Sequence, residues 1–203
     1  MDEYVNLPAN SPFSYHTFMH EHLFKHIDID PANINILNGE AHDLTQECNN
    51  FENKIKNVGG IELFLAGLGH DGHIAFNEPG SSLSSRSRVK TLTYDTIQKN
   101  AQHFGDNIES VPRMALTVGI ATILDAREIV CVVTGAVKSH AFMKCIEEGV
   151  SHMYPMSSLQ MHQNALIICD DDATLDCRVR TIKYFKGLEA TWKFSDEYQK
   201  DCK

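Results

Sequence analysis

The sequence predicts an α/β fold built on an open, mostly parallel sheet with helices on both faces. Two short runs, Ile61 to Leu65 and Glu128 to Thr134, are rich in apolar and β-branched residues, as is typical of buried parallel strands. Each run is followed by a glycine, Gly67 or Gly135. Segments of helical length lie between the strands, and a strand–helix–strand order produces parallel pairing.

The two N-terminal helices are predicted from segment length, caps and apolar spacing. Ser11 to Ile27 is long enough for a helix and precedes the first strand. In Leu44 to Val58, apolar residues recur every three to four positions, which gives that helix one apolar face. Asp43 and Thr45 are both candidate N-caps, because either side chain can accept a hydrogen bond from the first turn.

The C-terminal half alternates in the same way. A helix is predicted over Ala136 to Glu148, where Gly149 ends it, and a third buried strand over Ala165 to Cys169. A last helix is predicted over Asp172 to Phe185, ending at Gly187. The result is a Rossmann-like architecture, in which ligands bind beyond the carboxyl ends of the strands.

Length and composition fit one domain. The chain has 203 residues, of which 42% are hydrophobic, enough for a core without disulfides or metal. We expect a single α/β domain over residues 1–188 and a polar C-terminal tail over 189–203. The 18 Lys and Arg residues against 27 Asp and Glu give a net charge of −9, which argues against nucleic acid and anionic membranes as partners.

The predicted location is the cytoplasm. No apolar run approaches the roughly 18 to 20 residues that cross a bilayer, and the first residues lack the basic-then-apolar profile of a secretory signal. There is no C-x-x-C pair, so we expect reduced and mostly structural thiols. The cysteines are Cys48, Cys131, Cys145, Cys169, Cys177 and Cys202.

The loop after the first buried strand concentrates acid and base groups. Asp71 and His73 are two residues apart, so an extended backbone places the carboxylate beside the ring, where it fixes the tautomer and raises the basicity of the imidazole. Glu78 is placed to complete that relay from the other side. Three glycines permit positive φ and close approach by a substrate: Gly67, Gly69 and Gly72.

Two plainer explanations of this loop stay open. The glycines can form an ordinary turn that Asp71 caps, with His73 pointing into solvent. Alternatively, His70, His73 and Glu78 can bind a metal ion, although two histidines three residues apart in a loop lack a defined further ligand. The position directly after a buried parallel strand favours a functional site, and we expect one without metal.

A longer match points to a family. The string GHDGHIAFNEPGSSL at residues 69–83, with MDEYV at 1–5 and ALTVG at 115–119, closely resembles the glucosamine-6-phosphate deaminase (isomerase) family. The resemblance runs from residue 1 to about residue 189. It is specific, because the related sugar-phosphate lactonases share the Asp-Gly-His turn but do not continue as AFNEP, residues 75–79 here.

The resemblance implies a hydrolase of amino sugar (N-acetylglucosamine) catabolism. Members of the family convert glucosamine 6-phosphate and water to fructose 6-phosphate and ammonia, an aldose–ketose isomerisation with loss of the amine, without metal or organic cofactor. Carried onto this chain, His73 is the acid/base that opens the pyranose ring, and Asp71 and Glu78 orient it. Asp2 is the base that takes the proton from C2 and returns it at C1.

The resemblance also implies two phosphate sites. Lys138 contacts the substrate phosphate, although without the resemblance it is more typical of a solvated lysine at the start of a surface helix. In the allosteric members, N-acetylglucosamine 6-phosphate binds between subunits of a homohexamer. The residues that match this activator site are Ser81, Ser82, Arg88, Lys90, Thr91 and Tyr184.

Two departures from the family pattern bear on activity. About the first quarter of the family, with its first strand–helix unit and a Gly-Thr-rich phosphate loop, has no counterpart here, so we expect a truncated member. Gln102 stands where relatives usually place a cation that closes over the phosphate. The alternative function is therefore a catalytically impaired subunit that binds sugar phosphates or modulates a full-length paralogue. A sugar-phosphate lactonase is a third hypothesis.

Overall fold

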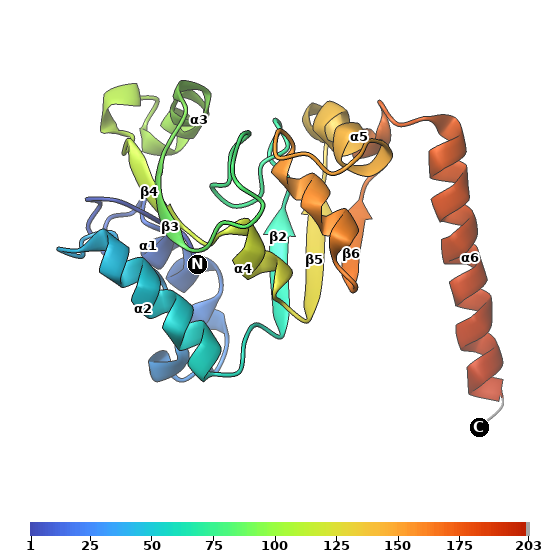
Figure 1. The fold of residues 1–203 in the computed structure, drawn as a ribbon, viewed down its shortest axis with the longest axis horizontal. Helices are drawn as coiled ribbons and strands as arrows, with labels where there is room; N and C mark the ends of the chain where they lie inside the picture. The colour runs from blue at the N-terminus through green and yellow to red at the C-terminus, as the bar shows by residue number, and fades with distance from the viewer. Residues whose placement is uncertain (202–203) are drawn as a thin grey trace.

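The computed structural model describes residues 1–201, with side chains described for residues 1–191. It contains an antiparallel sheet of order β1-β4-β3 and a parallel sheet of order β2-β5-β6, with helices around them (Figure 1). The strands are β1 Glu3–Tyr4, β2 Leu63–Gly67, β3 Arg88–Thr91, β4 Met114–Thr117, β5 Glu128–Val133 and β6 Ala165–Cys169.

From β3 onward the α-helices alternate with the strands, whereas α1 and α2 are consecutive and β3 follows β2 directly. The α-helices are α1 Tyr15–His22, α2 Leu44–Asn57, α3 Tyr94–Asn100, α4 Ile120–Leu124, α5 Ser139–Glu147 and α6 Val179–Asp201. The 3-10 turns are η1 Phe24–His26, η2 Pro31–Asn33, η3 Ala101–Phe104, η4 Ile108–Ser110, η5 Ala136–Lys138, η6 Pro155–Met161 and η7 Asp172–Thr174.

The parallel sheet confirms the three strands predicted from the apolar runs. β6 has the predicted bounds, β5 ends one residue earlier than predicted, and β2 begins and ends two residues later. Gly67 pairs with Val132, and Val133 pairs with Cys169, so the carboxyl ends of all three strands share one edge. The α/β class and the open parallel sheet are confirmed.

The antiparallel sheet had no clear signal in the sequence. β1 has two residues, and β3 is a four-residue segment with two cations. β4 is the central strand and pairs with both β1 and β3. Its Leu116 pairs with Glu3 on one side and with Val89 on the other. This sheet matters for function, since β1 carries the adjoining Asp2 to the side of β4.

The first two helices follow from their N-caps. α1 is shorter than the predicted helix, because it begins after Ser14, whose hydroxyl accepts the N–H of Thr17, and ends at His22. α2 matches its prediction to within one residue. Of its two candidate caps, the structure uses Asp43, which accepts the N–H of Gln46.

The C-terminal helix differs more from its prediction. The predicted start at residue 172 is the separate turn η7, and α6 begins at Val179 and continues through Gly187 to Asp201. The predicted polar tail thus lies within α6 as far as residue 201, and Cys202 lies outside the described residues. Among the described residues, no helix combines the length and the hydropathy that spanning a bilayer requires.

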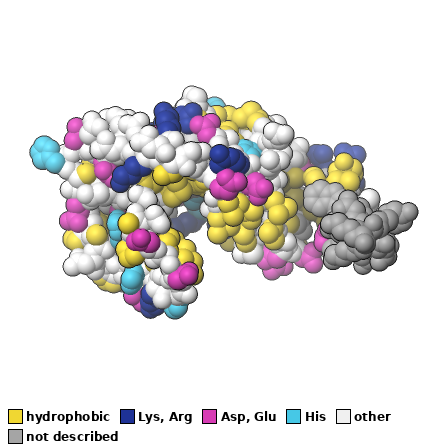
Figure 2. All heavy atoms as spheres, turned by 90° about the horizontal axis from the view of Figure 1, so that it is seen from below, with side chains coloured by type: hydrophobic (Ala, Val, Ile, Leu, Met, Phe, Trp, Pro, Cys, Tyr) yellow, Lys and Arg dark blue, Asp and Glu magenta, His cyan; other side chains and the backbone are white. Residues whose placement is uncertain are grey.

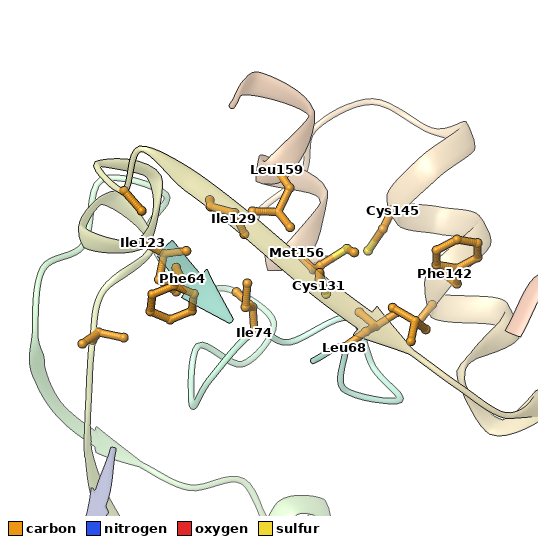
Figure 3. Close-up of a cluster of buried hydrophobic side chains, with 14 of the residues drawn as sticks. Phe64, Leu68, Ile74, Ile123, Ile129, Cys131, Phe142, Cys145, Met156 and Leu159 are labelled. Carbon is orange, nitrogen blue, oxygen red and sulfur yellow. The ribbon is translucent and has the colours of Figure 1, made fainter. Parts of the chain in front are cut away.

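The main core fills the space between one face of the parallel sheet and the elements α4, α5 and η6 (Figure 3). Ile129 and Cys131 of β5 are fully buried against Met156 of η6 and Phe142 of α5. Burial raises the pKa of the Cys131 thiol to about 12, so it stays protonated and acts as a small apolar residue. All five described cysteines are free, and three of them are buried: Cys48, Cys131 and Cys145.

The opposite face of the parallel sheet exposes apolar side chains. Leu65 of β2 is 70% exposed, and other exposed residues of the three strands are Leu63, Val132, Leu166 and Ile168. Figure 2 shows hydrophobic side chains gathered over the middle of the molecule, where Figure 1 places β2 and β5. Among the described residues, helices therefore cover one face of this sheet, whereas the sequence predicted helices on both.

The alternation of exposure along β2 leads to a stability prediction. Leu65→Lys is expected to change the free energy of unfolding by less than about 1 kcal/mol and to raise the soluble fraction, because it breaks an exposed apolar patch. Phe64→Lys, one residue away and 6% exposed, is the matched control and should unfold the protein. Urea unfolding of both variants checks this, and equal destabilisation by the two would contradict the open face.

Candidate active site

A cavity of about 290 Å³ lies at the edge where β2 and β5 end. Because parallel strands present their carboxyl ends at the same edge, the loop after β2 and the turn η5 after β5 meet there. The lining residues are Asp2, Tyr15, Gly67, Leu68, Gly69, His73, Ala75, Phe76, Thr96, Asn100 and Lys138. The cavity thus joins three of the predicted functional side chains, one from each of three distant parts of the chain.

A carboxylate and an imidazole are in contact at the wall of the cavity. Nδ1 of His73 lies 2.6 Å from Oδ1 of Asp71, and the same oxygen accepts the His73 backbone N–H at 3.2 Å. The ring is not aligned for a straight hydrogen bond through Nδ1. Burial opposes ionisation of Asp71, but its contacts with His73 outweigh burial and hold the pKa of the carboxyl below its usual range. Asp71 is therefore an anion at neutral pH, able to fix the orientation and tautomer of the ring.

Two glycines hold this loop in shape. A Cβ on Gly69 would lie 2.2 Å from Nδ1 of His73, so only glycine lets the backbone pass under the ring. Gly72 has φ +92°, and a Cβ there would also meet Tyr154 at 2.6 Å. Of the three glycines predicted to permit positive φ, the structure uses that freedom at Gly72 alone.

Asp2 reaches the cavity from the antiparallel sheet. Its Oδ1 accepts the backbone N–H of Val118 at 3.3 Å, which ties it to the end of β4. Burial raises the pKa of Asp2 above its usual value, against the hydrogen bonds that favour its ionised form. A raised pKa makes this carboxylate a stronger base than an exposed one.

Glu78 is buried, at 3% exposure, but the hydrogen bonds of its side chain go to the start of α3. Its Oε1 accepts from the Thr93 hydroxyl at 3.0 Å and the Thr96 hydroxyl at 2.5 Å, and from the Thr93 N–H at 3.1 Å. The structure therefore brings Asp71 to His73, while it uses Glu78 to anchor the helix that lines one wall of the cavity.

Lys138 enters the cavity from η5, directly after β5. Burial lowers the pKa of its ammonium group; Asp71 opposes that shift and Lys99 adds to it. Lys138 takes part in none of the ion pairs of the described residues. An unpaired cation in a concave site is suited to an anionic ligand group.

Three lining residues were not found from the sequence: Tyr15, Thr96 and Asn100. Burial raises the pKa of the Tyr15 hydroxyl, so it stays protonated and can donate a hydrogen bond. Asn100 donates to the hydroxyl of Tyr4 at 2.9 Å. These residues come from α1 and α3, and no sequence pattern joins those helices to the loop after β2.

The residues predicted for an activator site are divided between two regions. Ser81 is buried with an unpartnered hydroxyl, Ser82 contacts Ser84 at 3.0 Å, and Arg88 donates to the Asn77 side chain at 2.8 Å. Lys90 and Thr91 lie with Arg88 on β3. Tyr184 lies on α6. Figure 1 places this helix beyond β6, on the opposite side of the molecule from β3. Within one chain, Arg88, Lys90 and Thr91 share β3, and α6, which carries Tyr184, lies away from that strand.

A metal-binding arrangement is also available in the loop. Ligand atoms of His70, Asp71 and His73 all lie within 4.8 Å of one another, so Asp71 takes the place that the sequence hypothesis gave to Glu78. Asp71 and His73 already face each other at 2.6 Å, and a metal ion there would have to separate them. The acid/base arrangement needs no such rearrangement.

A larger hollow, about 440 Å³, lies at the other end of the parallel sheet. It is lined by Arg127 and Asn164, which precede β5 and β6, and by His162, whose Nε2 contacts the carbonyl of Ala126 at 2.7 Å. It holds no carboxylate beside an imidazole. The smaller cavity, lined by Asp2, Lys138 and the His73 that Asp71 contacts, is the candidate active site.

Known proteins resemble this chain along nearly its whole length. It matches the family described as glucosamine-6-phosphate isomerases/6-phosphogluconolactonase over residues 2–168. It is 60% identical over 188 residues to glucosamine-6-phosphate deaminase of Aedes aegypti and to glucosamine-6-phosphate deaminase 2 of Homo sapiens. Each match covers 93% of this chain and 68% of the relative.

Solved structures agree. A monomeric glucosamine-6-phosphate deaminase superposes with a TM-score of 0.83 at 41% identity, covering 85% of this chain and 71% of the other. A 6-phosphogluconolactonase from Trypanosoma brucei has a TM-score of 0.67 at 20% identity, covering 87% and 72%, and shares the fold alone. By sequence and by structure, the chain belongs to the glucosamine-6-phosphate isomerase/6-phosphogluconolactonase family.

Proposed function

We propose that this protein is a glucosamine-6-phosphate deaminase of amino sugar catabolism, which converts glucosamine 6-phosphate and water to fructose 6-phosphate and ammonia. Its identity of about 60% to proteins with that name supports the activity. The observation that carries the proposal is the convergence of the Asp71–His73 pair, Asp2 and Lys138 on one cavity.

The chemistry requires bases at two places. His73 exchanges a proton with the ring oxygen as the pyranose opens, and Asp71 holds the imidazole in position. Asp2 removes the proton from C2 and returns it at C1, which leaves an imine at C2. Water then adds to the imine carbon, and the nitrogen leaves as ammonia. One residue cannot reach both the ring oxygen and the C2 hydrogen. The cavity offers a separate base for each, His73 and Asp2.

Lys138 holds the substrate phosphate. The role of Glu78 differs from the expected one, which was to orient His73. Glu78, bound to Thr93 and Thr96, acts on the position of α3 rather than directly on the ring of His73. The site needs neither metal nor organic cofactor for this proton chemistry.

A substrate panel tests the proposal. The purified chain is expected to release ammonia from glucosamine 6-phosphate and to leave 6-phosphogluconolactone at its spontaneous rate of hydrolysis. The reverse preference would make the protein a lactonase. Binding of glucosamine 6-phosphate without turnover would instead support a catalytically impaired subunit, an alternative that the deaminase relatives do not favour.

The proposal extends to a cytoplasmic homo-oligomer, a hexamer by family resemblance, that N-acetylglucosamine 6-phosphate activates. The position of Tyr184 on α6, away from β3, supports an activator site completed by a second subunit. The solved deaminase that this chain resembles is described as monomeric. Sedimentation analysis of the chain therefore tests the hexamer directly.

The activator proposal predicts a thermal shift. N-acetylglucosamine 6-phosphate is expected to raise Tm, because a ligand that binds the folded state stabilises it by mass action. Arg88→Ala combined with Lys90→Ala should remove that shift and leave the shift caused by glucosamine 6-phosphate intact. An activator shift that survives the double substitution would contradict these residues.

The close passage of Gly69 under His73 predicts a selective loss of activity. Gly69→Ala is expected to lower kcat at least tenfold, because its methyl group displaces the ring from Asp71. Gly149→Ala is the matched control, since a Cβ there meets nothing within 4 Å. Steady-state kinetics with a Tm measurement separates this effect from unfolding, and an unchanged kcat in Gly69→Ala would contradict the placement of the ring.

A further inference from the structure

Two cations without partners lie in or beside the cavity. Lys138 lines it from η5, and Lys99 lies on α3 between Thr96 and Asn100, both of which line it. Neither lysine takes part in an ion pair or a side-chain hydrogen bond among the described residues. In a chain of net charge −9, a pair of unpartnered lysines at one cavity needs an explanation.

Lys99 is close enough to Lys138 for its charge to act on that ammonium group. Lys99 lowers the pKa of Lys138, in addition to the larger effect of burial. Both lysines also lower the pKa of His70, again after burial. Three basic groups therefore repel one another at this edge of the sheet, an arrangement that a bound dianion relieves.

The anchoring of α3 fixes where Lys99 stands. Thr93 caps the helix, and Glu78 accepts hydrogen bonds from Thr93 and Thr96, which ties the first turn to the loop after β2. Asn100 ties the last turn to Tyr4. Gln102, one turn further on, is exposed, and its amide nitrogen lies 3.2 Å from Nε2 of His103.

We propose that Lys99 is a second cationic contact for the phosphate group of the substrate, acting with Lys138 from the α3 side of the cavity. This inference rests on the proposed function for the identity of the substrate, but it concerns an anion subsite that inorganic phosphate can probe by itself. Lys99 supplies the charge that the Gln102 amide lacks, and it leaves the proton transfers to His73 and Asp2.

The effect of Lys99 should fall on binding. Lys99→Gln is expected to raise KM for glucosamine 6-phosphate and the Kd of inorganic phosphate about five- to tenfold, with kcat within twofold of wild type. The increase is moderate because Lys99 is exposed, and added salt should weaken wild-type binding more than binding by the variant. Lys99→Arg keeps the charge and should restore both constants to within twofold.

Two control variants make the experiment specific. Lys56→Gln removes an equal charge from an exposed position on α2 and should change neither constant, and Gln102→Ala should change neither. The inference is overturned if Lys99→Gln binds phosphate as wild type does, or if Gln102→Ala raises KM and Lys99→Gln does not. Two different failures can be told apart. If only the inference about Lys99 is wrong, the protein still turns over glucosamine 6-phosphate. If only the proposed function is wrong, phosphate affinity still depends on Lys99 but there is no turnover.

Discussion

His73→Ala is expected to reduce kcat for glucosamine 6-phosphate by on the order of 10²- to 10⁴-fold, the usual contribution of a positioned general acid/base. The imidazole is the cavity side chain held by an ionised carboxylate, with Nδ1 2.6 Å from Asp71. Its removal leaves ring opening to water. Tm should change little, because the ring is partly exposed at the cavity. Initial rates of ammonia release at saturating substrate give the measurement.

The control for this prediction is another histidine. His42→Ala removes an exposed imidazole ahead of α2 and should leave kcat unchanged. Asp71→Asn should lower kcat in the same direction as His73→Ala, and the double variant should be little worse than His73→Ala, since the two residues act as a unit. A fully active His73→Ala enzyme would rule out the proposed acid/base.

Asp2→Asn is expected to lower kcat by a similar factor, on the order of 10²- to 10⁴-fold, because the amide cannot accept the C2 proton. The substitution is conservative for the fold, since an amide oxygen can still accept the N–H of Val118. Deuterium exchange at C2 in D2O should be lost with turnover. Asp28→Asn, at an exposed position, is the matched control.

The raised pKa of Asp2 also predicts the acidic limb of the pH profile. A base must be ionised to act, so kcat should fall as the pH drops through the pKa of Asp2. Burial raises that pKa, so this fall should occur at a higher pH than for an ordinary aspartate. An acidic limb that Asp2→Asn leaves in place would assign the titration to another group.

The parallel sheet and its chemistry were predictable because strong local signals coincide there. The apolar runs of β5 and β6 fixed two strands to within a residue, and the parallel order placed the loop containing His73 beside the turn containing Lys138. Asp71 and His73 met as predicted, although a bend with positive φ at Gly72, and not an extended backbone, brings them together. In this part of the fold, local sequence and long-range topology point to the same arrangement.

The rest of the site depends on contacts without local patterns. β1 has two residues, so nothing in its own composition predicts that Asp2 reaches β4, and this position was expected through the family resemblance alone. Tyr15 and Asn100 were missed because they join the cavity through that sheet and α3. Glu78 binds α3 because Thr93 and Thr96 offer hydroxyl donors, an outcome of packing.

The most direct test of the whole account is the product stoichiometry of the purified chain. Incubated with glucosamine 6-phosphate, it should form ammonia and fructose 6-phosphate in a one-to-one ratio, and both products should disappear together in His73→Ala and Asp2→Asn. Ammonia without fructose 6-phosphate, neither product from a folded wild-type chain, or wild-type yields from either variant would contradict a deaminase site built on Asp2, Asp71 and His73.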